Sequence, residues 1–194
     1  MQTWAKESGI ISDMLSELQD DKLMELLRAG NKMAFRELFN RHSKSVMGYC
    51  VCHCGGNKAL AEDILQEVWM KVLRAAERYE AKGQFKAWLM TISRNTMLTH
   101  LGRQLKLHDD AEKAEARIPS NEDIELDFAQ KCDHQAVQKA ITELPDSQRV
   151  VLTLWLAEDL SYDQIAEATG LTEPSVRSLL FRAKKSLKAR LEAA

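Results

Sequence analysis

Apolar residues recur every three or four positions along most of this chain, which is the spacing of one face of an α-helix. The clearest runs are Leu23, Leu26 and Leu27; Phe35, Leu38 and Phe39; Ile64, Leu65, Val68 and Val72; and Trp88, Leu89 and Ile92. Only three prolines and eight glycines interrupt the 194 residues, and the abundant Leu, Ala, Glu and Lys lose little side-chain freedom in a helix. We therefore expect an all-α protein.

The helical spacing falls into two modules joined by an acidic segment. Between Lys106 and Asp133 there are nine acidic and four basic residues, with too little apolar periodicity to bury a helix face. We expect residues 21–104 to form one small helical domain, residues 105–134 a flexible acidic linker and residues 135–194 a second small helical domain. Residues 1–20 form an N-terminal extension.

The sequence shows no sign of export or membrane insertion. Residues 1–20 lack a basic segment followed by a long apolar run, and the chain has no stretch of ~18 consecutive apolar residues. We expect a cytoplasmic protein, and the reducing cytosol would keep its four cysteines as thiols or metal ligands.

Cysteine and histidine residues gather at the end of one apolar helical run. They are Cys50, Cys52, His53 and Cys54. If the helix continues to Cys54, residues 50, 53 and 54 share a face, but a structural zinc site needs four ligands. His42 lies upstream, and Cys132 and His134 follow the linker. Burial is the usual fate of cysteine, so we expect no cofactor, with Cys50, His53 and Cys54 as the candidates if a metal binds.

The most informative segment begins at Ser161 and has the pattern of helix, tight turn and helix. Ser161 and Gln164 match a capping box, in which each side chain accepts a hydrogen bond from the backbone N–H of the other residue. Gly170 can take the left-handed conformation that ends the first helix, and Thr172 can cap the second.

The second of these helices has a basic face, although the formal net charge of the chain is −2. From Arg177 to Arg190 there are six basic residues and no acidic one. We expect Val176 and Leu180 to pack inward. The residues expected to point outward are Arg177, Ser178, Phe181 and Arg182. The spacing alone fits either a solvated hairpin or a helix-turn-helix that binds DNA.

The last fifty residues, roughly, resemble region 4 of extracytoplasmic-function sigma factors. The resemblance is carried by Leu144–Arg149, Leu160–Glu167 and Ser175–Lys184. It implies that the second helix lies in the major groove of the upstream promoter element. The implied base contacts come from Arg177, Ser178, Phe181 and Arg182, and the implied phosphate contacts from Lys184 and Lys185. Pro174 and Leu179 depart from the family pattern, which commonly has Gly and Arg there.

The first module contains a helix with one apolar and one acidic face, within Ala61–Trp69. Taken alone, the acidic face is an ordinary solvated surface. The whole segment resembles region 2.2 of the same family, whose helix docks on the coiled coil of a large RNA polymerase subunit. The resemblance implies that Asp63, Gln66 and Glu67 bind core polymerase.

Aromatic and basic residues alternate from Tyr79 to Asn95, a combination that suits unpaired nucleotides but also fits core aromatics. Resemblance to regions 2.3 and 2.4 implies that the loop around Gly83 captures a flipped base of the downstream promoter element. The implied contacts are Lys82, Gln84 and Phe85 in the loop, and Arg94, Asn95 and Arg103 along the non-template strand. Thr99 and Gly102 depart from the family pattern.

These resemblances identify the chain as a member of the extracytoplasmic-function (group 4) sigma-70 family, which directs RNA polymerase to promoters and helps to open them. The implied partners are core RNA polymerase, promoter DNA and an anti-sigma factor lying between the two domains. The linker would either thread toward the polymerase active-site cleft or act as a tether. The alternative is a stand-alone metal- or redox-sensing helix-turn-helix regulator, which would not bind core polymerase. No catalytic constellation is recognisable, so we expect no enzyme.

Overall fold

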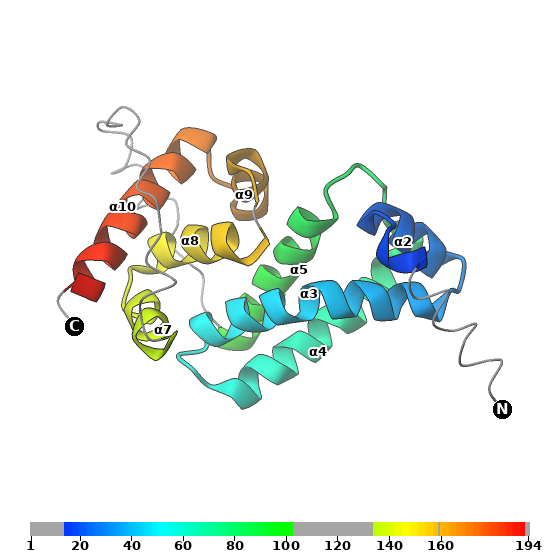
Figure 1. The fold of residues 1–194 in the computed structure, drawn as a ribbon, viewed down its shortest axis with the longest axis horizontal. Helices are drawn as coiled ribbons and strands as arrows, with labels where there is room; N and C mark the ends of the chain where they lie inside the picture. The colour runs from blue at the N-terminus through cyan, green and yellow to red at the C-terminus, as the bar shows by residue number, and fades with distance from the viewer. Residues whose placement is uncertain (1–13, 103–133, 159, 193–194) are drawn as a thin grey trace.

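The computed structural model describes residues 14–102, 134–158 and 160–192, and the regular structure in these ranges is entirely helical (Figure 1). The elements are α2 (Asp20–Arg28), α3 (Lys32–His53), α4 (Lys58–Ala75), the 3-10 helix η1 (Ala76–Arg78), α5 (Phe85–Leu101), α7 (His134–Thr142), α8 (Asp146–Glu158), α9 (Tyr162–Thr169) and α10 (Glu173–Glu192). The all-α prediction is confirmed. The expected linker, residues 105–134, lies outside the described residues apart from His134 at the start of α7.

Helices α2 to α5 form the first module. α2 packs on α3, α3 packs on α4, and α4 packs on α5. Leu23, Leu38, Ile64 and Leu89 come from these four helices and are fully buried. Burying each such side chain contributes about 1.5–3 kcal/mol, so the helical apolar spacing seen in the sequence supplies the core of this module.

Helices α7 to α10 form the second module, in which the long helix α10 packs against α8, α9 and α7. Its core includes Val150, Leu154, Ile165, Val176 and Leu180. Val176 and Leu180 point inward as the spacing predicted, because they lie on the face of α10 that meets α8 and α9.

The predicted turn between α9 and α10 is present with its caps. The Ser161 hydroxyl accepts a hydrogen bond from the Gln164 N–H at 3.3 Å, and the Gln164 side chain accepts one from the Ser161 N–H at 3.0 Å. Gly170 has a φ of +75°. The Thr172 hydroxyl accepts a hydrogen bond from the Ser175 N–H at 3.4 Å. These contacts satisfy helix termini that would otherwise need water and fix the relative position of the two helices.

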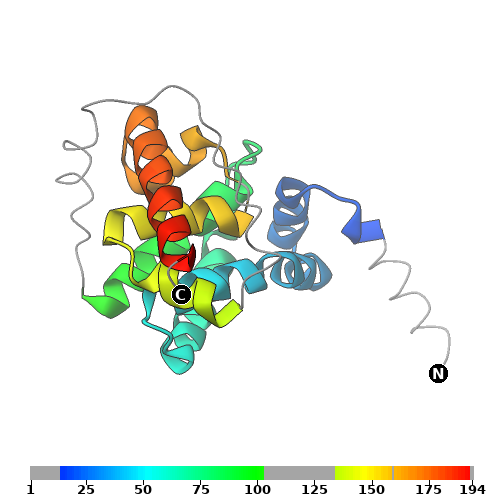
Figure 2. The same ribbon diagram turned by 60° about the vertical axis from the view of Figure 1, so that its left-hand side comes forward.

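The two modules lie against each other. α3 packs against α8 and α7, and α5 packs against α9 (Figures 1 and 2). His53 at the end of α3 is buried, and its Nε2 lies 3.0 Å from the Thr153 hydroxyl on α8. A polar contact between residues one hundred positions apart therefore joins modules that the sequence presents as separate.

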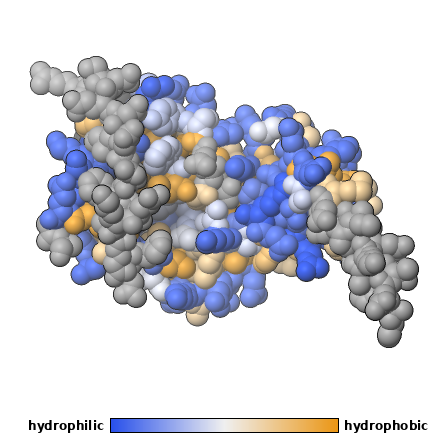
Figure 3. All heavy atoms as spheres, viewed as in Figure 1, coloured by the Kyte–Doolittle hydropathy of each residue, from blue (hydrophilic) through white to orange (hydrophobic). Residues whose placement is uncertain are grey.

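Hydrophilic residues cover most of the face shown in Figure 3, with hydrophobic residues scattered among them in small patches. Within the described ranges, no helix is both long and apolar enough to cross a membrane. Two of the large hydrophobic side chains that remain exposed, Met70 and Leu73, lie on α4.

Candidate polymerase and nucleic-acid interfaces

The outer face of α4 carries the three residues expected to bind core polymerase. Asp63, Gln66 and Glu67 are three and four positions apart, so they share one helix face. Asp63 and Gln66 are exposed. Glu67 forms ion pairs with Lys71 at 2.7 Å and His100 at 2.5 Å. The hydrogen bonds from Lys71 and His100 hold the pKa of Glu67 below its ordinary value, which keeps this face acidic.

Two hydrophobic side chains extend this acidic face, and the sequence analysis did not identify them. Met70 is 48% exposed and Leu73 is 38% exposed. Met70 lies four positions after Gln66 and is out of register with the buried stripe that contains Val68 and Val72. Leu73 lies at the edge of that stripe, four positions after buried Trp69. The register of Met70 is the signal that could have found it. An acidic face that continues into exposed hydrophobic side chains is suited to docking on a protein.

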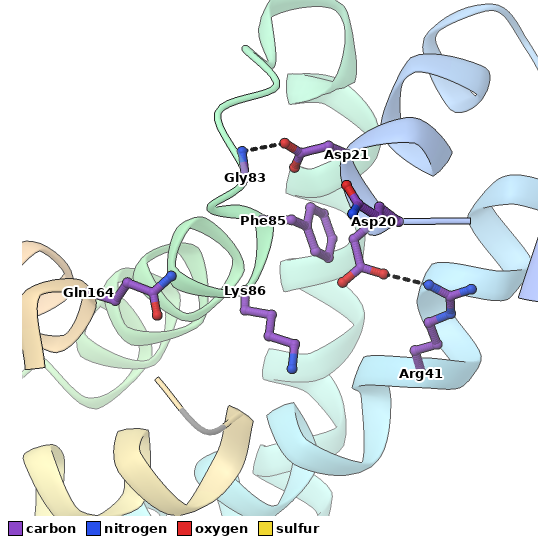
Figure 4. A pocket seen from close by; sticks show the side chains of 8 residues that line it. Asp20, Asp21, Arg41, Gly83, Phe85, Lys86 and Gln164 are labelled. Carbon is purple, nitrogen blue, oxygen red and sulfur yellow. Dashed lines mark hydrogen bonds and ion pairs between the residues drawn. The ribbon is translucent and has the colours of Figure 1, made fainter. Parts of the chain in front are cut away.

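The loop between η1 and α5 presents Lys82 and Gln84 to solvent. Between them, Gly83 has a φ of +72°, a conformation that favours glycine. The Gly83 N–H donates a hydrogen bond to the Asp21 carboxylate (Figure 4). The Tyr79 hydroxyl donates to the other oxygen of that carboxylate at 2.6 Å. α2 therefore holds the loop at two points.

Phe85, expected in the sequence analysis to help capture a base, lies in the core below this loop. Its side chain is only 3% exposed. The ring packs against His42, Tyr79 and Trp88, with centroid distances of 5.3, 6.0 and 5.8 Å. Phe85 is the first residue of α5 and points toward α3, so in this arrangement it supports the loop and offers no face to a base.

The residues expected along the non-template strand differ in their exposure to solvent. Asn95 is exposed on α5. Arg94 is partly buried, and its positive charge helps to lower the pKa of His53. It therefore faces the contact between the modules. The Arg94 Nε is buried without a hydrogen-bond partner. Arg103 lies outside the described residues.

The exposed part of the basic face of α10 contains Arg177 and Lys185. The Arg177 Nε donates to Glu173 at 3.0 Å, and the guanidinium lies 4.9 Å from the ring centroid of Tyr162 on α9. Lys184 is partly buried, with its ammonium 4.0 Å from the ring centroid of Trp155 on α8. Aromatic rings of the preceding helices thus hold two cations of α10 in place.

Other residues of α10 are less accessible than the spacing predicted. Ser178 is 8% exposed, because α10 is packed from more than one side and its buried face is wide. Phe181 and Arg182 are partly buried. Two nitrogens of Arg182, Nε and Nη2, are buried without a hydrogen-bond partner. The outward position expected for Ser178 is therefore not observed, and Arg182 has unused donors.

Helix α9 lies beside the loop of the first module. Glu167 of α9 lines a cavity of about 470 Å³ together with Lys82, Gln84 and Trp88. On the neighbouring side, Gln164 of α9 lines a cavity of about 420 Å³ whose other residues include Gly83 and Lys86 (Figure 4). The first helix of the helix-turn-helix and the loop expected to bind the downstream element therefore face each other.

The cysteines at the end of α3 have the properties of core residues. Cys50 is buried, and burial raises the pKa of its thiol to about 12. Burial also raises the pKa of Cys52 and Cys54, whereas burial and the nearby arginine charges lower the pKa of His53 to about 3. The thiols therefore stay protonated near neutral pH, as expected of buried cysteines that pack as small hydrophobic residues. Among the described residues, no three His, Cys, Asp or Glu side chains are grouped so that they could hold a metal ion. Cys132 lies outside them.

Comparisons with known proteins match both modules. The family description "Sigma-70 region 2" matches residues 38–106, and "Sigma-70, region 4" matches residues 134–187. The RNA polymerase sigma-H factor of Pseudomonas aeruginosa is 30% identical, over 92% of this chain and 97% of that protein. The ECF RNA polymerase sigma-E factor of Haemophilus influenzae is 28% identical, over 92% of this chain and 98% of its own length. These relatives are sigma factors, which are not enzymes.

Two solved structures share the fold. One is CnrH in complex with the cytosolic domain of CnrY, with a TM-score of 0.65 and 22% identity, over 90% of this chain and 97% of that chain. The other is the sigma factor RpoE in complex with the anti-sigma factor NepR from Bartonella quintana, with a TM-score of 0.62 and 23% identity, over 81% of this chain and 96% of that chain. With both sigma regions matched in order and a relative aligned along almost its full length, this chain belongs to the sigma-70 family, as a sigma factor of the extracytoplasmic-function type that acts in promoter-specific transcription initiation by RNA polymerase.

Proposed function

We propose that this sigma factor reads promoters with two surfaces, one on each module. α10 reads the upstream element in the major groove, with Arg177 and Arg182 at base edges and Lys185 on phosphate. The observation that carries this proposal is the capped turn at Gly170 and Thr172, which fixes α10 on α9 while Arg177 and Lys185 remain exposed.

The loop of the first module binds unpaired bases of the downstream element and so favours strand opening. Lys82 and Gln84 are its exposed contacts. Trp88 lines the same cavity as these two residues and is partly buried, so its ring can contribute to stacking. Phe85 supports the loop from the core side. Asn95 extends the surface along the non-template strand.

Core polymerase binds the outer face of α4. Asp63 and Gln66 supply polar contacts there, and Met70 and Leu73 supply hydrophobic area that is otherwise exposed to water. RNA polymerase works in the cytoplasm, so we place the protein there.

Promoter binding requires the two modules to separate. In the structure, Glu167 of α9 and the loop residues Lys82 and Gln84 line one cavity. A DNA strand that entered this cavity would meet the acidic Glu167, although Lys82 and Gln84 are themselves exposed. Core polymerase would stabilise a separated arrangement, whereas an anti-sigma factor would stabilise one that withholds these surfaces. RpoE, which shares this fold, was solved with the anti-sigma factor NepR bound, and CnrH was solved with the cytosolic domain of CnrY bound.

A binding and transcription experiment tests the proposal. At physiological salt, the isolated full-length chain should bind promoter fragments weakly, because its net charge is −2 and the acidic Glu167 of α9 lies beside its loop. With purified core polymerase added, run-off transcription from genomic fragments should give discrete products. Tight, sequence-specific binding of duplex promoter DNA by the isolated chain would support the stand-alone regulator instead.

A further inference from the structure

The carboxylate of Asp21 accepts hydrogen bonds from two positions of the downstream-element loop. The Tyr79 hydroxyl donates to one oxygen at 2.6 Å, and the Gly83 N–H donates to the other. These donors flank the exposed residue Lys82. One side chain of α2 therefore constrains the loop at its start and near its end, although Asp21 is 58 positions before Tyr79 and 62 before Gly83.

α2 is itself fixed to the body of the module by a polar network. Arg41 of α3 donates to Asp20 at 2.8 Å (Figure 4). His42 Nε2 lies 2.9 Å from the second oxygen of Asp20. Arg41 also donates to the backbone carbonyls of Leu15, Ser16 and Leu18. Burial would raise the pKa of Asp20, but the bonds from His42 and Arg41 outweigh burial and lower it. Asp20 therefore stays ionised and anchors α2 beside the loop.

We propose that α2 is a positioning element for the downstream promoter loop and that Asp21 is its positioning residue. This inference rests on the proposed function of the loop. α2 ends at Arg28, ten positions before the first residue matched as sigma-70 region 2, which is Leu38. The surface that captures a base would thus depend on a helix that precedes the matched region.

The physical effect is preorganisation. A loop that is held before DNA arrives loses less conformational freedom when it captures a base, so binding and opening are both favoured. The Tyr79 ring is also fixed, since it packs edge-on against Trp88 at 4.8 Å. Burial and the bond to Asp21 raise the pKa of Tyr79 above its ordinary value, so its hydroxyl remains a proton donor at any physiological pH.

The test uses Asp21→Asn in the full-length chain. Asparagine keeps the size of the side chain but removes its charge and one acceptor oxygen, so any hydrogen bond that it keeps with the Gly83 N–H is no longer charge-assisted. In the free chain, hydrogen exchange at the Gly83 amide should rise about tenfold, which corresponds to the replacement of a charge-assisted hydrogen bond by a neutral one. In the holoenzyme, a duplex promoter that has been mapped by run-off transcription should open more slowly by about the same factor. Permanganate reactivity of the unpaired thymines measures the opening rate.

Two variants control for other effects. Glu25→Gln makes the same charge change on the same helix, but Glu25 pairs with exposed Lys22 at 2.6 Å and should leave exchange and opening unchanged. Tyr79→Phe keeps the ring and removes one donor, so it should act like Asp21→Asn to a smaller extent. Core binding and protection of the upstream element should stay at the level of the unmodified protein, which a general folding defect would not allow.

The outcomes separate this inference from the proposed function. If Lys82→Ala with Gln84→Ala slows opening but Asp21→Asn does not, the loop binds DNA and the positioning role of Asp21 is wrong. Unchanged exchange at Gly83 in Asp21→Asn would also overturn it. If the double loop variant opens promoters at the normal rate, the proposed function of the loop is wrong, and the inference about Asp21 fails with it.

Discussion

Acidification should weaken the contact between the two modules through His53. This side chain is 5% exposed, and its Nε2 lies 3.0 Å from the Thr153 hydroxyl across the contact. Burial, with the charges of Arg149 on α8 and Arg94 on α5, lowers the pKa of His53 to about 3. On its own helix, the Tyr49 ring lies 4.5 Å from the imidazole. No acidic group is among the causes that shift the pKa of His53. The closed arrangement therefore contains no charge that would stabilise the protonated imidazole.

The sign and size of the effect follow from proton linkage. Because the pKa in the structure is below the ordinary 6.5, the closed form binds fewer protons than a form in which His53 meets water. The contribution of neutral His53 to the stability of the closed form is therefore fully present above pH 6.5 and is lost as the pH drops below that value. Between pH 7.0 and 5.5 the loss is about 1 kcal/mol for this one group, which is about a fivefold change in the equilibrium.

Urea unfolding of the full-length chain at pH 7.0 and 5.5 measures this loss. His53→Gln is the matched control, since glutamine can still hydrogen-bond to Thr153 and does not titrate. Other titrating groups, His42 among them, contribute in both proteins, so the difference between the two pH dependences isolates His53. We expect the unmodified protein to lose about 1 kcal/mol more than the variant. Equal losses in the two proteins would refute the buried, neutral state of His53.

Three further predictions concern recognition, docking and helix capping. Arg177→Ala should relax preference at one upstream position by ~1 to 3 kcal/mol, whereas Lys185→Ala should weaken all sequences alike and flatten the salt dependence, as measured across a promoter library. Asp63→Ala combined with Met70→Ala should weaken binding to core polymerase in a titration without lowering the thermal midpoint, because both side chains point to solvent. Ser161→Ala should cost about 1 kcal/mol of stability in thermal unfolding, through loss of the capping box.

Local patterns in the sequence predicted the local structure well. The caps at Ser161 and Thr172 and the turn at Gly170 depend on neighbouring residues alone, and they are present as expected. The inward faces of α4 and α10 likewise follow from a period of 3.6 residues. The acidic face of α4 was predicted, but its extension to Met70 was not. The motif contains the polar residues of this face and does not include hydrophobic residues that lie outside the buried stripe.

Long-range packing explains where the expectations failed. Ser178 was expected outward because one helix face was assumed to be buried, but α10 packs against α7, α8 and α9, which widens its buried face. For Phe85 the sequence left two positions open, one in contact with a base and one in the core, and the ring lies in the core among His42, Tyr79 and Trp88. The exposure of the two residues beside Phe85 in the sequence does not indicate whether a distant helix covers its side chain.

The contact of α9 with the loop leads to one more prediction, which concerns how the closed form withholds a cation from DNA. Lys82 pairs with Glu80 at 2.6 Å, and the hydrogen bond and charge of Glu80, followed by the charge of Glu167 on α9, raise the pKa of Lys82. The carboxylate of Glu80 belongs to the loop and stays beside Lys82, whereas that of Glu167 moves away with α9 when the modules separate. Closure therefore reduces the positive potential of the loop, although Lys82 itself stays exposed.

Glu167→Gln removes the contribution of α9 without changing the size of the side chain. The free full-length chain should then bind a single-stranded oligonucleotide of the non-template promoter strand more tightly at low salt. The gain should be less than about fivefold, because the interaction between exposed charges is weak. Fluorescence anisotropy measures it, and 0.5 M salt should abolish it, since about this concentration screens exposed charges over a few ångströms. Glu62→Gln, an exposed carboxylate on α4, makes the same change in net charge away from the loop. If it enhances binding as much as Glu167→Gln does, the effect is that of net charge, and the position of Glu167 beside the loop has no role.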